Sequence, residues 1–156
     1  MSDAKSTEVK PPIILPPHYV LIAVVLMIAS IWLTQSLLIS EPWPKLGVLF
    51  AGFGVGIAAW AARQFSQAKT NIIPLSHSDA LVVSGVFSHT RNPMYLGMIS
   101  FLFGVALLAN NWLALSVLPV FYFIIRHLFI AREEKLMLAT FGDEYASYCK
   151  NVRRWI

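Results

Sequence analysis

Cysteine and charge are both scarce in this chain of 156 residues. The single cysteine, Cys149, excludes an internal disulfide framework and a cysteine-rich metal site. Charged residues make up only 13% of the chain and hydrophobic residues 57%, and the mean hydropathy is +0.65. This composition is too apolar for a soluble domain of this length. The histidines show no spacing typical of metal ligands, so no metal site is predicted.

Several signatures of soluble enzymes and nucleic-acid binders are also missing. The sequence has no phosphate-binding Walker loop and no apparent nucleophile–histidine–acid set. The formal net charge is +4, but the basic residues flank apolar runs instead of clustering on one polar face. We therefore expect no nucleic-acid partner, and we interpret these residues as charges that orient a protein in a membrane.

Long apolar runs predict an all-α integral membrane protein with four transmembrane helices. About 20 apolar residues cross a hydrocarbon core of roughly 30 Å. The four predicted spans are residues 19–39, 46–62, 94–109 and 112–130, within a transmembrane domain over 18–131. Pro93 suits the first turn of the third span, because its missing N–H costs nothing there. Asn110 and Asn111 then form a turn, so the last two spans make an antiparallel hairpin.

The segments outside the spans are more polar. Residues 1–17 are polar and then proline-rich, which predicts a flexible cytosolic tail. Residues 63–92 form a long polar connection between the second and third spans. Residues 132–156 predict an amphipathic helix, broken near Gly142, that lies on the membrane surface and completes the site.

The distribution of Lys and Arg predicts the orientation. All of them except Lys45 lie in the N-terminal tail, in or beside the 63–92 connection, or in the C-terminal part. Because positive charge favours the cytoplasmic side, both termini and the long loop are predicted to be cytosolic. We expect a multi-pass protein of the bacterial inner membrane. The stretches 85–97 and 132–148 then face one compartment and can form two halves of one site.

Arg91 lies beside the predicted start of the third span. Free N–H groups and the helix dipole attract anions at such a position, and an arginine can clamp a carboxylate or phosphate there. A positive-inside anchor followed by a proline helix start explains Arg91 and Pro93 equally well, but it leaves Asn92 and Tyr95 unexplained. His89 is a weaker candidate because of its proximity to Arg91.

Two pairs of ionisable residues with a spacing of seven connect the end of the fourth span to the residues after it. Arg126 precedes Glu133, and His127 precedes Glu134, so two helical turns place each pair on nearly one face. Ionisable residues at the edge of an apolar core usually face a bundle interior or a wet cavity. Snorkelling and ordinary interfacial ion pairs explain the same residues equally well.

The second span carries closely spaced glycines. Gly52 and Gly56 form a GxxxG pattern, which permits close helix packing in membranes. Gly54 and Gly56 also form a GxG pattern, which would let a cofactor approach the backbone. Packing is the commoner use of such glycines in membrane helices.

Together these residues resemble the membrane methyltransferases related to isoprenylcysteine carboxyl methyltransferase and phosphatidylethanolamine N-methyltransferase. That family combines a glycine-containing span, the pattern G-x-[YF]-x-x-x-R-[HN]-P-x-Y-x-G, a helical hairpin, and E-E-x-x-L-x-x-x-F-G-x-x-Y-x-x-Y. The matching residues are Gly85, Phe87, Arg91, Asn92, Pro93, Tyr95, Gly97, Glu133, Glu134, Leu136 (one residue early), Phe141, Gly142, Tyr145 and Tyr148. The likeness covers roughly residues 50–154. Asn92 departs from the histidine typical of the prenylcysteine enzymes, which weakens transfer of their substrate.

The resemblance implies S-adenosylmethionine as methyl donor, bound on the cytosolic side between the last two spans and the C-terminal helix. The cofactor-binding residues that it implies are Gly54, Gly56, His89, Arg91, Tyr95, Arg126, Glu133, Glu134 and Tyr145. Arg91, Asn92 and Tyr95 are expected at the reacting centre. The expected acceptor is lipophilic and enters from the bilayer: an isoprenylcysteine-like carboxylate, a lipid amine or a thiol. An amine would need a base, for which His89 and His127 are candidates.

Two other classes of protein remain possible from the sequence. A sterol-reductase-like membrane enzyme using NADPH has a similar carboxyl end, but the Glu133–Glu134 pair and the short chain argue against it. A non-enzymatic four-span protein, either a transporter or an assembly helper, is the other alternative. A transporter typically needs an acidic residue within its spans, and the first three predicted spans contain none. The oligomeric state is left open.

Overall fold

The computed structural model describes residues 13–34, 37–76 and 78–156. Within these residues every regular element is a helix, so the predicted all-α class is confirmed. The elements are α1 (Pro16–Leu33), the 3-10 turn η1 (Trp43–Leu46), α2 (Gly47–Gln67), the 3-10 turn η2 (Gly85–Ser88), α3 (Pro93–Ala109), α4 (Trp112–Ile125), the π-helix η3 (Arg126–Ile130) and α5 (Ala131–Asn151). Most of the predicted N-terminal tail, residues 1–12, lies outside the described part of the chain.

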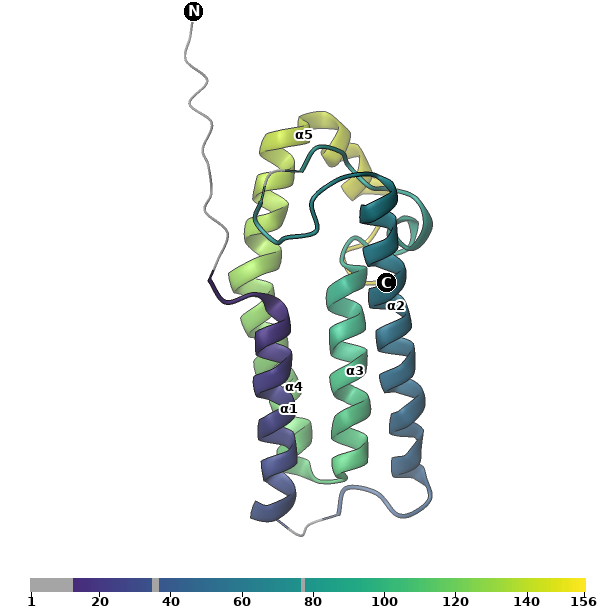
Figure 1. Ribbon diagram of the computed structural model, residues 1–156, viewed down its shortest axis with the longest axis vertical. Helices are drawn as coiled ribbons and strands as arrows, with labels where there is room; N and C mark the ends of the chain where they lie inside the picture. The colour runs from purple at the N-terminus through teal and green to yellow at the C-terminus, as the bar shows by residue number, and fades with distance from the viewer. Residues whose placement is uncertain (1–12, 35–36, 77) are drawn as a thin grey trace, which may run out of the picture.

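The helices form a bundle with its loops sorted to two ends. Figure 1 shows α1, α2, α3 and α4 side by side along the long axis, with α5 and the α2–α3 connection at one end. In the part of the chain that the structure describes, three helices are long and apolar enough to cross a membrane: Pro16–Leu33, Trp43–Gln67 and the continuous run Trp112–Asn151. The shorter apolar helix α3 has 17 residues. Large apolar side chains cover the outer faces of α1, α2 and α4, where lipid would solvate them.

The first helix ends earlier than the apolar run predicts. α1 stops at Leu33, and Thr34 is extended with φ −145° and ψ 137°. The apolar residues beyond it form a loop that is tied to the α3–α4 turn. Leu38 N donates a hydrogen bond to the backbone oxygen of Asn110 at 3.0 Å. The Asn110 side chain accepts from Ile39 N through Oδ1 at 3.0 Å and donates to Ile39 O through Nδ2 at 2.9 Å. The predicted span 19–39 is therefore too long at its carboxyl end, because hydropathy does not register these hydrogen bonds.

The α3–α4 turn consists of Asn110 and Asn111. Asn110 ends α3 in the left-handed conformation, with φ 50° and ψ 41°, which asparagine tolerates better than most residues. Asn111 caps α4 by accepting a hydrogen bond from Ala114 N at 2.8 Å. The same side-chain oxygen accepts from Ser30 Oγ at 3.1 Å, which links the turn to α1.

The second helix runs beyond its predicted end at residue 62. Arg63 does not terminate it, and α2 continues to Gln67. This extra turn brings Phe65 against Phe87, with their ring centroids 5.2 Å apart and the rings edge-to-face. It also brings Gln64 against Gly85, which has φ +60° and no room for a Cβ. The end of α2 thus holds Gly85 and Phe87 in place.

Glycines let α2 and α3 pack backbone to backbone. A Cβ built on Gly54 would lie 2.4 Å from Gly97 O, and one on Gly47 would lie 2.4 Å from Gly104 O. Each helix therefore presents two glycines seven residues apart to the other helix. Among the described residues, no atom lies within 4 Å of a Cβ placed on Gly52. The packing role falls on Gly54 and its partners instead of on the predicted GxxxG pair.

We predict that Gly54→Ala destabilises the protein, because the new methyl group forces α2 away from the α3 backbone. Overpacking of this kind costs roughly 1–3 kcal/mol. Thermal unfolding in detergent, with loss of helical circular dichroism, measures the change. Gly52→Ala is the matched control on the same helix, and we expect it to leave the melting temperature unchanged or to raise it through better helix propensity. Equal destabilisation by both variants would contradict the assignment.

Candidate active site

A kink turns the C-terminal helix back toward the start of α3. Gly142 interrupts α5 with φ 52° and ψ −123°, at the residue where the sequence predicts a break. Residues with a Cβ rarely adopt this conformation, whereas glycine does so readily. Beyond the kink, Tyr148 donates its hydroxyl hydrogen to Phe87 O at 2.6 Å. The second half of α5 is thereby fixed to η2.

The last residues of the chain dock on the loop that precedes α3. Arg91 N donates to Arg153 O at 3.0 Å. The Arg154 carbonyl accepts from Thr90 Oγ1 at 3.2 Å and from Asn92 Nδ2 at 3.1 Å. Thr90 and Asn92 are both buried, with exposed fractions of 3% and 8%. The C-terminal segment therefore forms part of the wall around Arg91.

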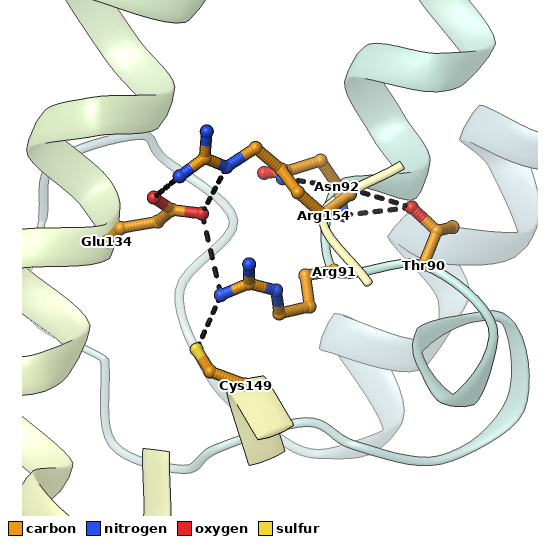
Figure 2. Close-up of polar contacts among 6 residues, drawn as sticks. All are labelled: Thr90, Arg91, Asn92, Glu134, Cys149 and Arg154. Atoms are coloured by element: carbon orange, nitrogen blue, oxygen red, sulfur yellow. Dashed lines mark hydrogen bonds and ion pairs between the residues drawn. The ribbon is translucent and has the colours of Figure 1, made fainter. Parts of the chain in front are cut away.

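Two arginines share the carboxylate of Glu134. Arg154 makes a two-pronged pair with it, from Nε to Oε1 at 2.8 Å and from Nη2 to Oε2 at 2.7 Å. Arg91 Nη1 lies 3.5 Å from Oε1 and also donates to Cys149 Sγ. Figure 2 shows this cluster together with the backbone anchors of Arg154. The hydrogen bonds to Glu134 raise the pKa of Arg154 above its already high ordinary value.

The neighbouring carboxylate has a different partner. Tyr95 donates its hydroxyl hydrogen to Glu133 Oε1 at 2.7 Å, and the Tyr95 side chain is buried. Tyr95 stands in the first turn of α3, whose first intrahelical bond runs from Leu96 N to Asn92 O at 2.9 Å. The two adjacent glutamates are therefore held by different elements: Glu133 by α3, and Glu134 by the C-terminal segment.

One buried donor of this cluster is left without a partner. Arg91 Nε has no hydrogen-bond partner within the described residues, although the Arg91 side chain is only 14% exposed. Leaving a buried donor unpaired costs free energy. The Arg91 guanidinium thus has unused hydrogen-bonding capacity, and a carboxylate or phosphate oxygen beside it would be stabilised.

These side chains line a cavity of about 330 Å³. The polar lining residues from the start of α3 and from α5 are Arg91, Asn92, Tyr95, Glu133, Glu134, Tyr145 and Tyr148. Asn71, Ser76 and Ser78 of the α2–α3 loop add further polar groups. Apolar lining comes from the start of α1, including Leu15, Pro16 and Pro17, and from the 71–82 segment of the α2–α3 loop. A mostly apolar cavity with a few convergent polar groups is typical of a small-molecule site, and such sites range from roughly 300 to 1,000 Å³.

A buried threonine holds the loop part of this wall. Thr70 Oγ1 accepts from Asp79 N at 3.0 Å and from Ala80 N at 3.4 Å. Thr70 itself is only 9% exposed. Thr70 thus fixes one end of the α2–α3 loop to residues 79 and 80, and the apolar residues of the loop form part of the cavity wall.

Four of the predicted site residues lie outside the cavity. Gly54 packs against α3, and Gly56 is exposed on the outer face of α2. His89 is exposed, with Nδ1 3.0 Å from Ser88 Oγ and 3.3 Å from Gly85 O. Arg126 lies in η3, where its Nη1 is 3.5 Å from Tyr122 Oη.

The π-helix explains the position of Arg126. A π-turn closes i→i+5 bonds instead of i→i+4 bonds, so the α-helical spacing does not hold across η3. A separation of seven residues then no longer places Arg126 on the face of Glu133. His127, the other basic candidate, stacks on Phe123 with centroids 6.4 Å apart and is exposed.

Arg154 and the contact of Cys149 with Arg91 were not predicted from the sequence. Arg154 reaches Glu134 across 20 residues and the Gly142 kink, and no helical spacing predicts such a contact. The 71–82 loop was not predicted as a cavity wall either. The apolar cluster at 80–83, which is too short to span a membrane, was the available signal for that wall.

The sequence matches a known protein family. The family model described as phospholipid methyltransferase matches residues 43–144, from η1 to just beyond the Gly142 kink in α5. The chain belongs to the phospholipid methyltransferase family. Membership identifies it as a membrane methyltransferase in general terms. A protein from Haemophilus influenzae, described only as an uncharacterized protein, is 40% identical over 63 residues, which are 40% of this chain and the whole of that relative.

We predict that Gly142→Ala releases the C-terminal segment of this methyltransferase. Alanine at φ 52° is strained by on the order of 1–3 kcal/mol, although no neighbouring atom obstructs its methyl group. Trypsin should then cleave faster after Arg153 and Arg154, as followed by mass spectrometry. Ser147→Ala, at an exposed position of the same helix, serves as control. An unchanged cleavage rate for Gly142→Ala would show that the kink does not hold the segment.

Proposed function

We propose that the protein transfers a methyl group from S-adenosylmethionine to a lipophilic acceptor at the cytosolic face of a membrane. The observation that carries this proposal is the guanidinium of Arg91, whose buried Nε is unpaired within the described residues, in the wall of a cavity that Glu133 and Tyr145 also line. Membership of the phospholipid methyltransferase family supports a methyltransferase over a membrane reductase or a non-enzymatic membrane protein.

The donor set of the cavity fits the amino-acid end and the adenosine end of this cofactor. Arg91, which lines the cavity, can bind the carboxylate through its guanidinium. Glu133 can accept from the ammonium or the ribose hydroxyls, whereas Arg154 already engages both oxygens of Glu134. The rings of Tyr145 and Tyr148, 6.1 Å apart, offer faces for the adenine or the sulfonium. When bound, S-adenosylmethionine supplies an electrophilic methyl group.

The chain's own contribution to the reaction is alignment and exclusion of water. Tyr95, Arg91 and Asn92 are fixed by hydrogen bonds to α5 or to the C-terminal segment, so they can hold reactants in one orientation. The apolar lining excludes water from the reacting atoms. A carboxylate or thiolate acceptor needs no base. For an amine, Glu133 is better placed than the exposed His89 and His127 to accept the proton.

We further propose a four-span topology with both termini and the α2–α3 loop in the cytosol. α3, with 17 residues, is about 25 Å long at 1.5 Å per residue, slightly short of a hydrocarbon core of roughly 30 Å. Its close packing on α2 supports its placement as a span. The similarity to a Haemophilus influenzae protein supports a bacterial inner membrane. The acceptor, whether a lipid amine, a thiol or an isoprenylcysteine-like carboxylate, would enter from the bilayer.

Calorimetric titration of the detergent-solubilised protein with S-adenosylhomocysteine tests the cofactor assignment. We expect micromolar binding that weakens at least tenfold in Arg91→Ala and in Glu133→Ala. A charge-assisted hydrogen bond contributes about 1.5–3 kcal/mol, and 1.4 kcal/mol corresponds to a factor of ten. Thermal unfolding of each variant verifies that it is folded.

Two matched controls come from charged residues that lie outside the cavity. Arg126→Ala and Glu144→Ala should bind S-adenosylhomocysteine as the wild-type protein does, because neither residue lines the cavity. No binding by folded wild-type protein, repeated in lipid nanodiscs, would reject the proposal. If only water-soluble acceptors were methylated in a substrate screen, the lipophilic acceptor would be rejected while the cofactor stands.

A further inference from the structure

Arg154 joins the C-terminal segment, the loop before α3 and α5 at one point. Its carbonyl accepts hydrogen bonds from Thr90 and Asn92, and its guanidinium binds both oxygens of Glu134. Because the backbone of Arg154 is anchored, its side chain meets Glu134 in a defined direction. A two-pronged arginine–carboxylate pair adds geometric specificity to this contact.

The distances show which arginine holds Glu134. Arg154 lies 2.7–2.8 Å from the two carboxylate oxygens, whereas Arg91 Nη1 lies 3.5 Å from the nearer one. With both oxygens occupied by Arg154, Glu134 does not form a two-pronged pair with Arg91. The Nε of Arg91 then stays without a partner although it is buried.

We propose that Arg154 is a positioning residue that keeps Glu134 from forming a two-pronged pair with Arg91, so that the Arg91 guanidinium in the cavity wall stays available to the carboxylate of a ligand. The inference rests on the proposed function, since it assigns the Arg91 guanidinium to an anionic group of the cofactor. Without Arg154, Glu134 is free to turn onto Arg91 and to compete with that group. Arg154 thus acts through Glu134 and touches no ligand.

The decisive experiment measures, by calorimetry, the affinities of the wild-type protein and of Arg154→Gln for two ligands. S-adenosylhomocysteine carries the amino-acid carboxylate, and 5′-methylthioadenosine lacks it. We expect Arg154→Gln to weaken S-adenosylhomocysteine binding about tenfold, equivalent to roughly 1.4 kcal/mol, and to leave methylthioadenosine binding within about twofold of wild type. Arg153→Gln is the matched control, because the Arg153 side chain is exposed and only its carbonyl is engaged; both affinities should stay unchanged.

A double variant separates positioning from general support of the fold. If Glu134 is the competitor, Glu134→Gln in the Arg154→Gln background removes it and restores S-adenosylhomocysteine affinity to within about threefold of wild type. If Arg154→Gln does not fold, Arg154→Lys replaces it in the same comparison. Lysine keeps the positive charge but cannot make a two-pronged pair with Glu134.

The possible outcomes decide between the proposals. Equal loss of both ligands, losses that multiply in the double variant, or unchanged S-adenosylhomocysteine binding would each overturn the role of Arg154. If wild-type protein binds neither ligand, the cofactor assignment itself fails. Selective loss of S-adenosylhomocysteine binding, with recovery in the double variant, supports both.

Discussion

The pairing of one carboxylate with two arginines is the constraint on which the site depends. Glu134 is partly buried and close to an apolar bundle, where an unpaired charge is costly. Its partners come from distant parts of the chain, Arg91 before α3 and Arg154 after α5. To bring them together, α5 must kink at Gly142 and the last residues must return to the α3 loop.

The same site needs a fixed platform, and close helix packing supplies it. Gly54 and Gly97 bring the α2 and α3 backbones into contact, and the extra turn of α2 places Phe65 against Phe87. The backbone carbonyl of Phe87 in turn accepts a hydrogen bond from the Tyr148 hydroxyl. The packing of two helices within the bundle is therefore transmitted through η2 to the segment that carries Arg91. A shift of α2 against α3 would therefore move Arg91 within the cavity wall.

The sequence predicted the helical bundle and several cavity residues, because hydropathy and the motif both report them directly. Tyr95, Glu133 and Tyr145 do line one cavity. Prediction from the sequence failed where the structure has a non-local contact or an irregular helix. The π-helix removes Arg126 from the predicted face, Asn110 takes the end of the predicted first span into a loop, and the Glu134–Arg154 pair crosses a kink. Hydropathy does not register the hydrogen bonds of Asn110, and periodicity assumes regular helices, so neither predicts these three features.

The cavity divides its tasks between different kinds of structure. The charged groups are fixed by helices, a glycine kink and hydrogen bonds to the chain's own backbone. Much of the apolar lining comes from the irregular 71–82 segment, which Thr70 holds through a hydrogen bond from Asp79 N. Loops tolerate substitution and insertion better than the elements that they connect. Changes in this segment can therefore reshape the apolar part of the cavity while Arg91, Glu133 and Glu134 keep their geometry. Under the proposed function, the choice of acceptor could then vary independently of cofactor binding.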